Sequence, residues 1–191
     1  MKITGIIAEY NPFHNGHAYQ IKAAKERGSD CAVAVCGGLF SQRGELSVCT
    51  KTAKAKAAAA GGADLVIELP LCYTLSPAPD FAAGGVKIID ALGCADFLTF
   101  GCEEETPDRL FDVLKALETI ENTDAVKNAL KNGCSLPSSR QQALFEINPE
   151  FADIISKPNN ILALEYISAL KKIGSAVTPV AVPRKGALHG S

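Results

Sequence analysis

The side chains best suited to chemistry are two histidines near the N-terminus, His14 and His17, in the stretch NPFHNGH. They are two of only three histidines in the chain, and Gly16 lies between them. Imidazole N–H groups suit the charge that builds on a phosphate during group transfer. Glycine lets the backbone approach a ligand because it has no Cβ. The pattern therefore favours a phosphate site, with His14 and His17 as the candidate catalytic residues.

Two other interpretations of the pair stay open at this point. The histidines could bind a metal from one helix face, although Glu9 is the only nearby carboxylate and the motif holds no cysteine. They could also be surface or capping residues, because a four-residue pattern is weak alone. Their place after an apolar strand and before a helix favours phosphate, since a helix N-terminus offers unpaired N–H groups and a partial positive charge.

The elements that must position this motif alternate along the first hundred residues. Strand-like apolar runs cover residues 3–8, 31–36, 64–69 and 96–101, and helix-like runs cover residues 17–28, 50–62 and 80–93. Three of the strands are continuously apolar, which is typical of a parallel sheet covered on both faces. We therefore expect an α/β fold with a Rossmann-like, doubly wound, mostly parallel sheet. Ligands bind at the carboxyl ends of such strands, where residues 9–17 lie.

The second half of the chain is predicted to be mostly helical. Helices are expected over residues 107–122, 123–133 and 159–174, with a further helix that Ser138 or Ser139 would cap and that runs to about Phe145. Residues 175–183 form a late strand-like run. We expect a nucleotide-binding α/β core over residues 1–105, and a helical extension over residues 106–191 whose late strand completes the site.

Composition restricts the partners and the compartment. The net charge of −2 excludes a strongly basic field, so binding of nucleic acid would need a local patch. Arg43, Lys51, Lys54 and Lys56 are the best candidates for one, although the lysines could equally be a solvated helix face. We expect no membrane span and no signal peptide. Seven cysteines without a C-x-x-C pair indicate a reduced, cytoplasmic protein whose cysteines are mostly buried.

Longer motifs connect this chain to a known family. The stretch EYNPFHNGH at residues 9–17 resembles the H-x-G-H signature of the nucleotidylyltransferase superfamily. Within it, the chain resembles the bacterial tRNA(Met) cytidine acetate ligases. The further elements that carry this resemblance are SQRGE at 41–45, GADLVIELP at 62–70, FGCEE at 100–104, SKPNNILALEY at 156–166 and AVPRKGALHGS at 181–191.

The resemblance implies an ATP-dependent ligase that acts on elongator tRNA(Met). Acetate would attack the α-phosphate of ATP, with Mg²⁺ accompanying the nucleotide, and pyrophosphate would leave. The N4 amine of the wobble cytidine would then take the acetyl group from acetyl-adenylate and release AMP. An anticodon base is unpaired, so its presentation to a pocket costs little.

The resemblance also implies roles for individual residues. The ATP cradle would comprise Ile7, Ala8, Glu9, Tyr10, Asn11, Pro12, Phe13, His14, Asn15, Gly16, His17, Ala18, Tyr19 and Gln20. Gly101 would let the adenine or ribose approach, Asn159 or Asn160 would hydrogen-bond the nucleotide, and Arg184 would pair with phosphate. From the residues alone, Gly101 could be a strand-end turn, the asparagines helix caps, and Arg184 a surface charge.

Two alternatives to the ligase remain at this level. Known family members are longer, so we expect a later tRNA-binding part to be missing from this chain. A small-molecule nucleotidylyltransferase of the same superfamily would share the H-x-G-H motif. A truncated module that binds ATP without acting on tRNA would share all of the nucleotide-binding residues.

Overall fold

The computed structural model describes residues 1–104, 108–121 and 123–183. The chain divides into two compact units. The first comprises residues 1–101 together with the chain from Glu165 onward, and the second comprises residues 102–164. The expected division at residues 105 and 106 stays a prediction.

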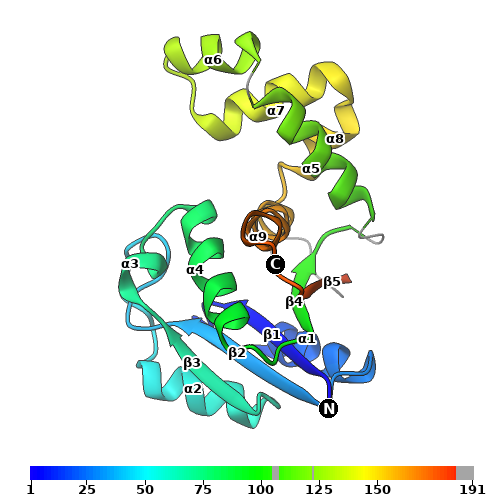
Figure 1. The fold of residues 1–191 in the computed structure, drawn as a ribbon. Coiled ribbons are helices and arrows are strands. Elements are labelled where there is room, and N and C mark those ends of the chain that lie inside the picture. The colour runs from blue at the N-terminus through cyan, green and yellow to red at the C-terminus, as the bar shows by residue number, and fades with distance from the viewer. Residues whose placement is uncertain (105–107, 122, 184–191) are drawn as a thin grey trace. The chain divides into compact units, whose positions relative to one another are not determined.

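A five-stranded sheet forms the centre of the first unit (Figure 1). Its strands are β1 (Ile3–Ala8), β2 (Cys31–Gly37), β3 (Leu65–Leu69), β4 (Phe97–Cys102) and β5 (Thr178–Pro183), in the spatial order β3-β2-β1-β4-β5. The pairs β1–β2, β1–β4 and β2–β3 are parallel. The prediction of a Rossmann-like, mostly parallel sheet is therefore confirmed.

Helices cover both faces of this sheet. Helices α1 (Asn15–Glu26) and α2 (Lys51–Ala60) lie on one face, and α4 (Ala78–Ala91) lies on the other (Figure 1). Helix α4 approaches β1 closely because each contributes a glycine to the contact: a Cβ at Gly5 of β1 would lie 2.6 Å from Ile89 Cδ1, and one at Gly85 of α4 would lie 2.7 Å from Ile7 Cδ1. Alanines allow a similar approach under α1 and α2, where Ala24, Ala32, Ala34 and Ala58 are buried.

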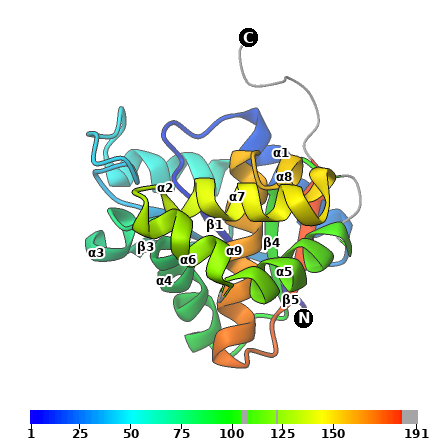
Figure 2. The same cartoon turned by 90° about the horizontal axis from the view of Figure 1, so that it is seen from above.

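The second unit is helical. It contains α5 (Asp108–Ile120), α6 (Asp124–Lys131), α7 (Leu136–Ile147), α8 (Pro149–Ile154) and the start of α9 (Pro158–Ile173), and α5 to α8 gather together in both views (Figures 1 and 2). Its core includes Leu110, Val113, Leu117, Val126, Leu144 and Ile154. None of the helices in the described part of the chain combines the length and apolar character needed to cross a bilayer.

The structure corrects several local expectations. Ser135 caps α7, rather than Ser138 or Ser139: its Oγ accepts from Ser138 N, and the buried Ser139 lies inside the helix. Two short helices were not predicted, α3 (Leu71–Thr74) and α8. The expectation of mostly buried cysteines was wrong, because only Cys36 and Cys102 are buried, although all seven are free of disulfides.

Candidate functional site

The turn between β1 and α1 carries the histidine motif. It leaves the carboxyl end of β1 through Tyr10, whose φ of 49° lies in the left-handed region that non-glycine residues rarely adopt. The Asn11–Pro12 peptide bond that follows is cis. The chain then enters α1 at Asn15, with His14 as its N-cap. The predicted order of strand, motif and helix is thus found, with the helix beginning two residues earlier than expected.

The two histidines form a reciprocal cap at the start of α1. His14 Nδ1 accepts from Gly16 N at 3.1 Å, and His17 Nδ1 accepts from His14 N at 3.2 Å. A neutral imidazole whose Nδ1 accepts a hydrogen bond carries its proton on Nε2. The cap therefore selects the tautomer in which each ring has an Nε2–H donor. Capping and phosphate binding, which the sequence presented as alternatives, are compatible because they use different ring nitrogens.

Aromatic packing fixes the orientation of the rings. The imidazoles of His14 and His17 stack with their centroids 3.7 Å apart and their planes at 22°. Tyr10 meets His17 edge-on at 4.8 Å and Phe13 at 5.0 Å. His14 remains exposed and His17 is half-buried. The aromatic contacts hold the two imidazoles in one geometry. The exposure of His14 leaves the pair accessible to a solute.

Gly16 is required by the cap itself. A Cβ on this residue would lie 2.9 Å from His14 Cε1, so any larger residue would displace the imidazole that caps the helix. The sequence attributed this glycine to the approach of a ligand. The structure adds the histidine cap as a second reason for a glycine here.

Tyr10 is an unusual member of this turn because it is buried. Its side chain is 1% exposed, and among the described residues its hydroxyl finds no hydrogen-bond partner. Burial raises the pKa of the Tyr10 phenol above its ordinary value, so the group stays neutral at physiological pH. The ring acts as a packing surface under His17.

Hydrogen bonds tie the motif to the segment that follows β2. Glu9 Oε1 accepts from Gln42 N at 2.5 Å, and Asn11 Oδ1 accepts from Val48 N at 2.8 Å. The SQRGE element therefore lies on the same side of the sheet as the histidine turn, as its place after β2 indicated. The sequence did not show that Glu9 and Asn11 would act as acceptors for backbone N–H groups.

The end of β4 lies on the same edge of the sheet. Gln20 Nε2 donates to Thr99 O at 2.9 Å and so joins α1 to β4. Gly101 follows two residues later, near the carboxyl end of a strand that neighbours β1. The fold thus brings the ends of β1, β2 and β4 to one edge, where residues 9–17, 42–45 and 101 are found.

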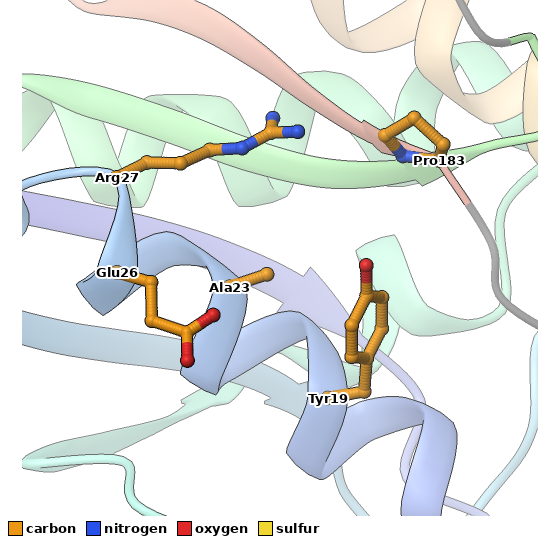
Figure 3. Close-up of a pocket in the computed structure, with 5 residues that line it drawn as sticks. All are labelled: Tyr19, Ala23, Glu26, Arg27 and Pro183. Carbon is orange, nitrogen blue, oxygen red and sulfur yellow. The ribbon is translucent and has the colours of Figure 1, made fainter.

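A surface pocket of about 350 Å³ lies beside α1. It lies between α1 and the end of β5 and is lined by Tyr19, Ala23, Glu26, Arg27 and Pro183 (Figure 3). Figure 3 shows the Tyr19 ring reaching from α1 toward Pro183. Arg27 Nη1 donates to Ala181 O at 2.6 Å, which secures β5 beside α1.

The asparagines of the KPNN motif belong to the second unit. Asn160 is fully buried, and its amide is occupied: Oδ1 accepts from Glu103 N at 2.8 Å, while Nδ2 donates to Ile154 O at 3.1 Å and to Glu104 Oε1 at 3.2 Å. Asn159 is only partly buried, and its side chain donates to Glu103 Oε1. These contacts join the chain after β4 to the start of α9. Arg184 lies outside the described residues.

A lysine completes the network around Asn160. Lys157 Nζ lies 3.0 Å from Asp153 Oδ2 and 3.2 Å from Glu104 Oε1. The hydrogen bonds to Asp153 and then to Glu104 raise the pKa of the Lys157 ammonium above its ordinary value. The nearly buried Glu104 thus has both Lys157 and the Asn160 amide as donors.

The expected basic patch is not formed as a group. Lys54 is buried rather than exposed, and Lys51 pairs with Glu68 at 2.9 Å. Arg43 and Lys56 are exposed. Lys54 Nζ donates instead to the backbone carbonyls of Gly37 and Gly38.

Comparison with known proteins was consistent across sequence and structure. A model of the family HIGH Nucleotidyl Transferase matches residues 1–191. The chain is 43% identical to a tRNA(Met) cytidine acetate ligase of Thermoanaerobacter sp. (strain X514), over all of this chain and 49% of that protein. It is 41% identical to that of Acetivibrio thermocellus, over 96% of this chain and 46% of the relative.

Two solved structures of Thermotoga maritima TmcAL are similar. One, bound with alpha-thio ATP, matches with a TM-score of 0.90 and 37% identity over all of this chain and 48% of the other. The other, an apo form, matches with a TM-score of 0.88 and 38% identity over 98% of this chain and 46% of the other. The chain spans about half the length of the curated relatives it matches. With a family model that covers it from end to end, the chain belongs to the HIGH nucleotidyl transferase family.

Proposed function

We propose that this chain is the ATP-binding and acetate-activating part of a tRNA(Met) cytidine acetate ligase. The observation that carries the proposal is the reciprocal cap of His14 and His17, which engages Nδ1 of each ring and does not use Nε2. The similarity to tRNA(Met) cytidine acetate ligases, and to a TmcAL structure bound with alpha-thio ATP, supports the choice of nucleotide and reaction.

In the first step an acetate oxygen bonds to the α-phosphorus of ATP. The bond from that phosphorus to the bridging oxygen breaks, and pyrophosphate leaves. Charge grows on the phosphate oxygens as this happens. His14 and His17 would donate to these oxygens, and the N-terminus of α1 adds its partial positive charge. Mg²⁺ would enter with ATP, bound to its phosphates, and neutralise part of their charge.

In the second step the N4 amine of the tRNA cytidine attacks the carbonyl carbon of acetyl-adenylate. The bond from that carbon to the AMP oxygen breaks, and the amine loses a proton. Adenylation makes this step feasible because AMP is a good leaving group. Direct attack of the amine on free acetate would have to expel an oxygen as hydroxide, which is a poor leaving group. A ligase of this kind would work in the cytoplasm, where tRNA and ATP are present.

Other residues would shape the nucleotide site. Residues 7–20 would form the cradle, and Gly101 would admit the adenine or ribose at the end of β4. Of the two asparagines, Asn159 is the better candidate for a nucleotide contact because the amide of Asn160 is buried and occupied. Arg184 remains a candidate phosphate partner from its sequence position.

The proposal is tested by incubating the chain with ATP and labelled acetate, then separating the products. We expect acetyl-adenylate and pyrophosphate in equal amounts, and formation of AMP when tRNA(Met) is added. Failure to form acetyl-adenylate would overturn the ligase. Acetyl-adenylate without transfer to tRNA would restrict this chain to the activation half of the reaction.

A further inference from the structure

The lysine Lys54 is buried next to the loop that follows β2. Lys54, on α2, is 1% exposed, although its helix reads in the sequence as a row of alanines and surface lysines. Its ammonium donates to Ser47 Oγ at 2.7 Å, to Gly38 O at 2.8 Å and to Gly37 O at 3.4 Å. Two of these acceptors are backbone carbonyls at and just after the end of β2.

The geometry of Lys54 determines what it can do. An ammonium has three protons, and here three neutral oxygens accept them, so no donor is left for a ligand. Burial of a charge is expensive unless hydrogen bonds compensate it. A lysine held in this way therefore acts through the backbone that it binds.

That backbone is the loop of residues 38–48, which follows β2. Inside the loop, Phe40 and Leu46 form an antiparallel bridge, and Ser41 Oγ accepts from the backbone N–H groups of Arg43 and Glu45. Lys54 reaches both ends of the loop, because Gly38 begins it and Ser47 lies near its end.

Other residues of loop 38–48 contact the histidine turn. Gln42 N donates to Glu9, and Val48 N donates to Asn11, so both bonds end within five residues of His14. Loop 38–48 thus makes hydrogen bonds both to Lys54 and to residues 9–11. A change in the loop would move the acceptors that precede the histidine cap.

We propose that Lys54 is a positioning residue for the nucleotide site: it fixes loop 38–48 so that the loop holds residues 9–11 in the geometry that binds ATP. The inference rests on the proposed function, because ATP is the ligand whose site is positioned. If the loop is ordered before ATP binds, the binding free energy is not reduced by the entropy lost in ordering it.

The test compares three variants of the 191-residue chain with the wild type. Lys54→Met keeps the apolar stem and removes the charge and its donors. Lys54→Arg keeps a charged donor, and Lys56→Met removes an exposed lysine from the same helix. Hydrogen exchange followed by mass spectrometry reports the loop, and calorimetric titration reports ATP affinity.

In Lys54→Met we expect amides of residues 38–48 to exchange about 10- to 100-fold faster, the factor for losing one hydrogen bond to a charged group. ATP affinity should fall about tenfold, while exchange in α4 stays unchanged. Lys54→Arg should recover most of both effects, and Lys56→Met should match the wild type. If Lys54→Met does not fold, Ser47→Ala must show the same pattern with smaller amplitude.

Different outcomes separate the two proposals. A wild-type chain that does not bind ATP would overturn the proposed function. Wild-type ATP binding with unchanged affinity in Lys54→Met would overturn the positioning role alone. Faster exchange spread evenly over the whole chain would also overturn it, because a merely structural lysine would give that result.

Discussion

His14 has two separable tasks at the level of the single residue. Its Nδ1 caps α1 by accepting from Gly16 N, and its Nε2–H is the proposed donor to phosphate. Most residues that cap helices offer only the first function. A substitution that keeps the acceptor and removes the imidazole therefore isolates the catalytic task.

We predict that His14→Ala and His14→Asn both slow formation of acetyl-adenylate by about 10²- to 10³-fold, the usual loss for one charge-stabilising donor. Their stabilities should differ, because asparagine is a good N-cap and alanine is not; His14→Ala should lose about 1 kcal/mol. Rate assays and urea unfolding measure the two effects. A His14→Asn variant with wild-type rate would remove His14 from the chemistry.

Tyr10 provides a second test at this scale. Its buried hydroxyl has no partner among the described residues, while its ring supports His17. Tyr10→Phe keeps the ring and removes an unsatisfied polar group, so the free energy of unfolding should stay equal or rise by about 1 kcal/mol. Urea unfolding checks this. A loss of stability would show that the hydroxyl makes a hydrogen bond in solution.

At the level of elements, aspartates secure the amino ends of the strands, opposite the candidate site. Asp64 Oδ2 accepts from Ala32 N at 2.8 Å and pairs with Lys25 at 2.8 Å. Asp96 Oδ2 accepts from Ile3 N at 2.8 Å, and its Oδ1 pairs with Lys2 at 2.6 Å. These bonds hold β1 and β2 at the amino ends of the strands.

Low pH should lower the free energy of unfolding, because it removes the charge of Asp96 at this end of the sheet. The hydrogen bond from Lys2, and then that from Ile3 N, hold the pKa of Asp96 below its ordinary value of about 3.9. The stabilisation is therefore fully present above about pH 4 and is lost as the pH falls through the lowered pKa of the folded state. Urea unfolding between pH 6 and 3 should show a smaller loss for Asp96→Asn than for the wild type. Equal losses would contradict this role.

The sequence was informative where one periodic run makes one element. Continuous apolar runs predicted β1 and β2 to within one residue, and the place of the histidine motif after β1 predicted its position in the fold. The helix expected over residues 107–122 is found as α5, whose leucines repeat at helical spacing and are buried. In each case the burial of adjacent residues decides the structure, and adjacent residues are what a sequence displays.

The sequence was uninformative where contacts between residues far apart in the chain determine the structure. The four residues of α3 and the six of α8 are too few to show a period. The bond between Glu9 and Gln42 joins residues 33 positions apart, and Lys54 turns inward only because backbone carbonyls after β2 receive it. Such contacts depend on the assembled sheet and leave no local pattern.

At the scale of the whole molecule, the second compact unit uses the two KPNN asparagines for different contacts, which their sequence did not distinguish. The Asn160 side chain makes three hydrogen bonds inside the second unit, whereas the Asn159 side chain donates to Glu103 and stays partly exposed. Structural and ligand-binding tasks would then fall on adjacent residues of one helix.

We therefore predict opposite profiles for two alanine variants. Asn160→Ala leaves Glu103 N and a nearly buried carboxylate short of partners, so the second unit should lose about 2–4 kcal/mol. Hydrogen exchange in α5 to α9 measures this loss. Asn159→Ala should change exchange little and weaken ATP binding. Reversed profiles would assign the nucleotide contact to Asn160.

The most direct test of the central claim is a titration of the isotopically labelled chain with ATP, followed by NMR. The account predicts that the largest changes fall on the backbone amides of Gly16 and His17 and on the imidazole Nε2 signals of His14 and His17, because these groups belong to the cap that would bind the phosphates. Unchanged signals at these four positions, with or without ATP-induced changes elsewhere, would contradict it.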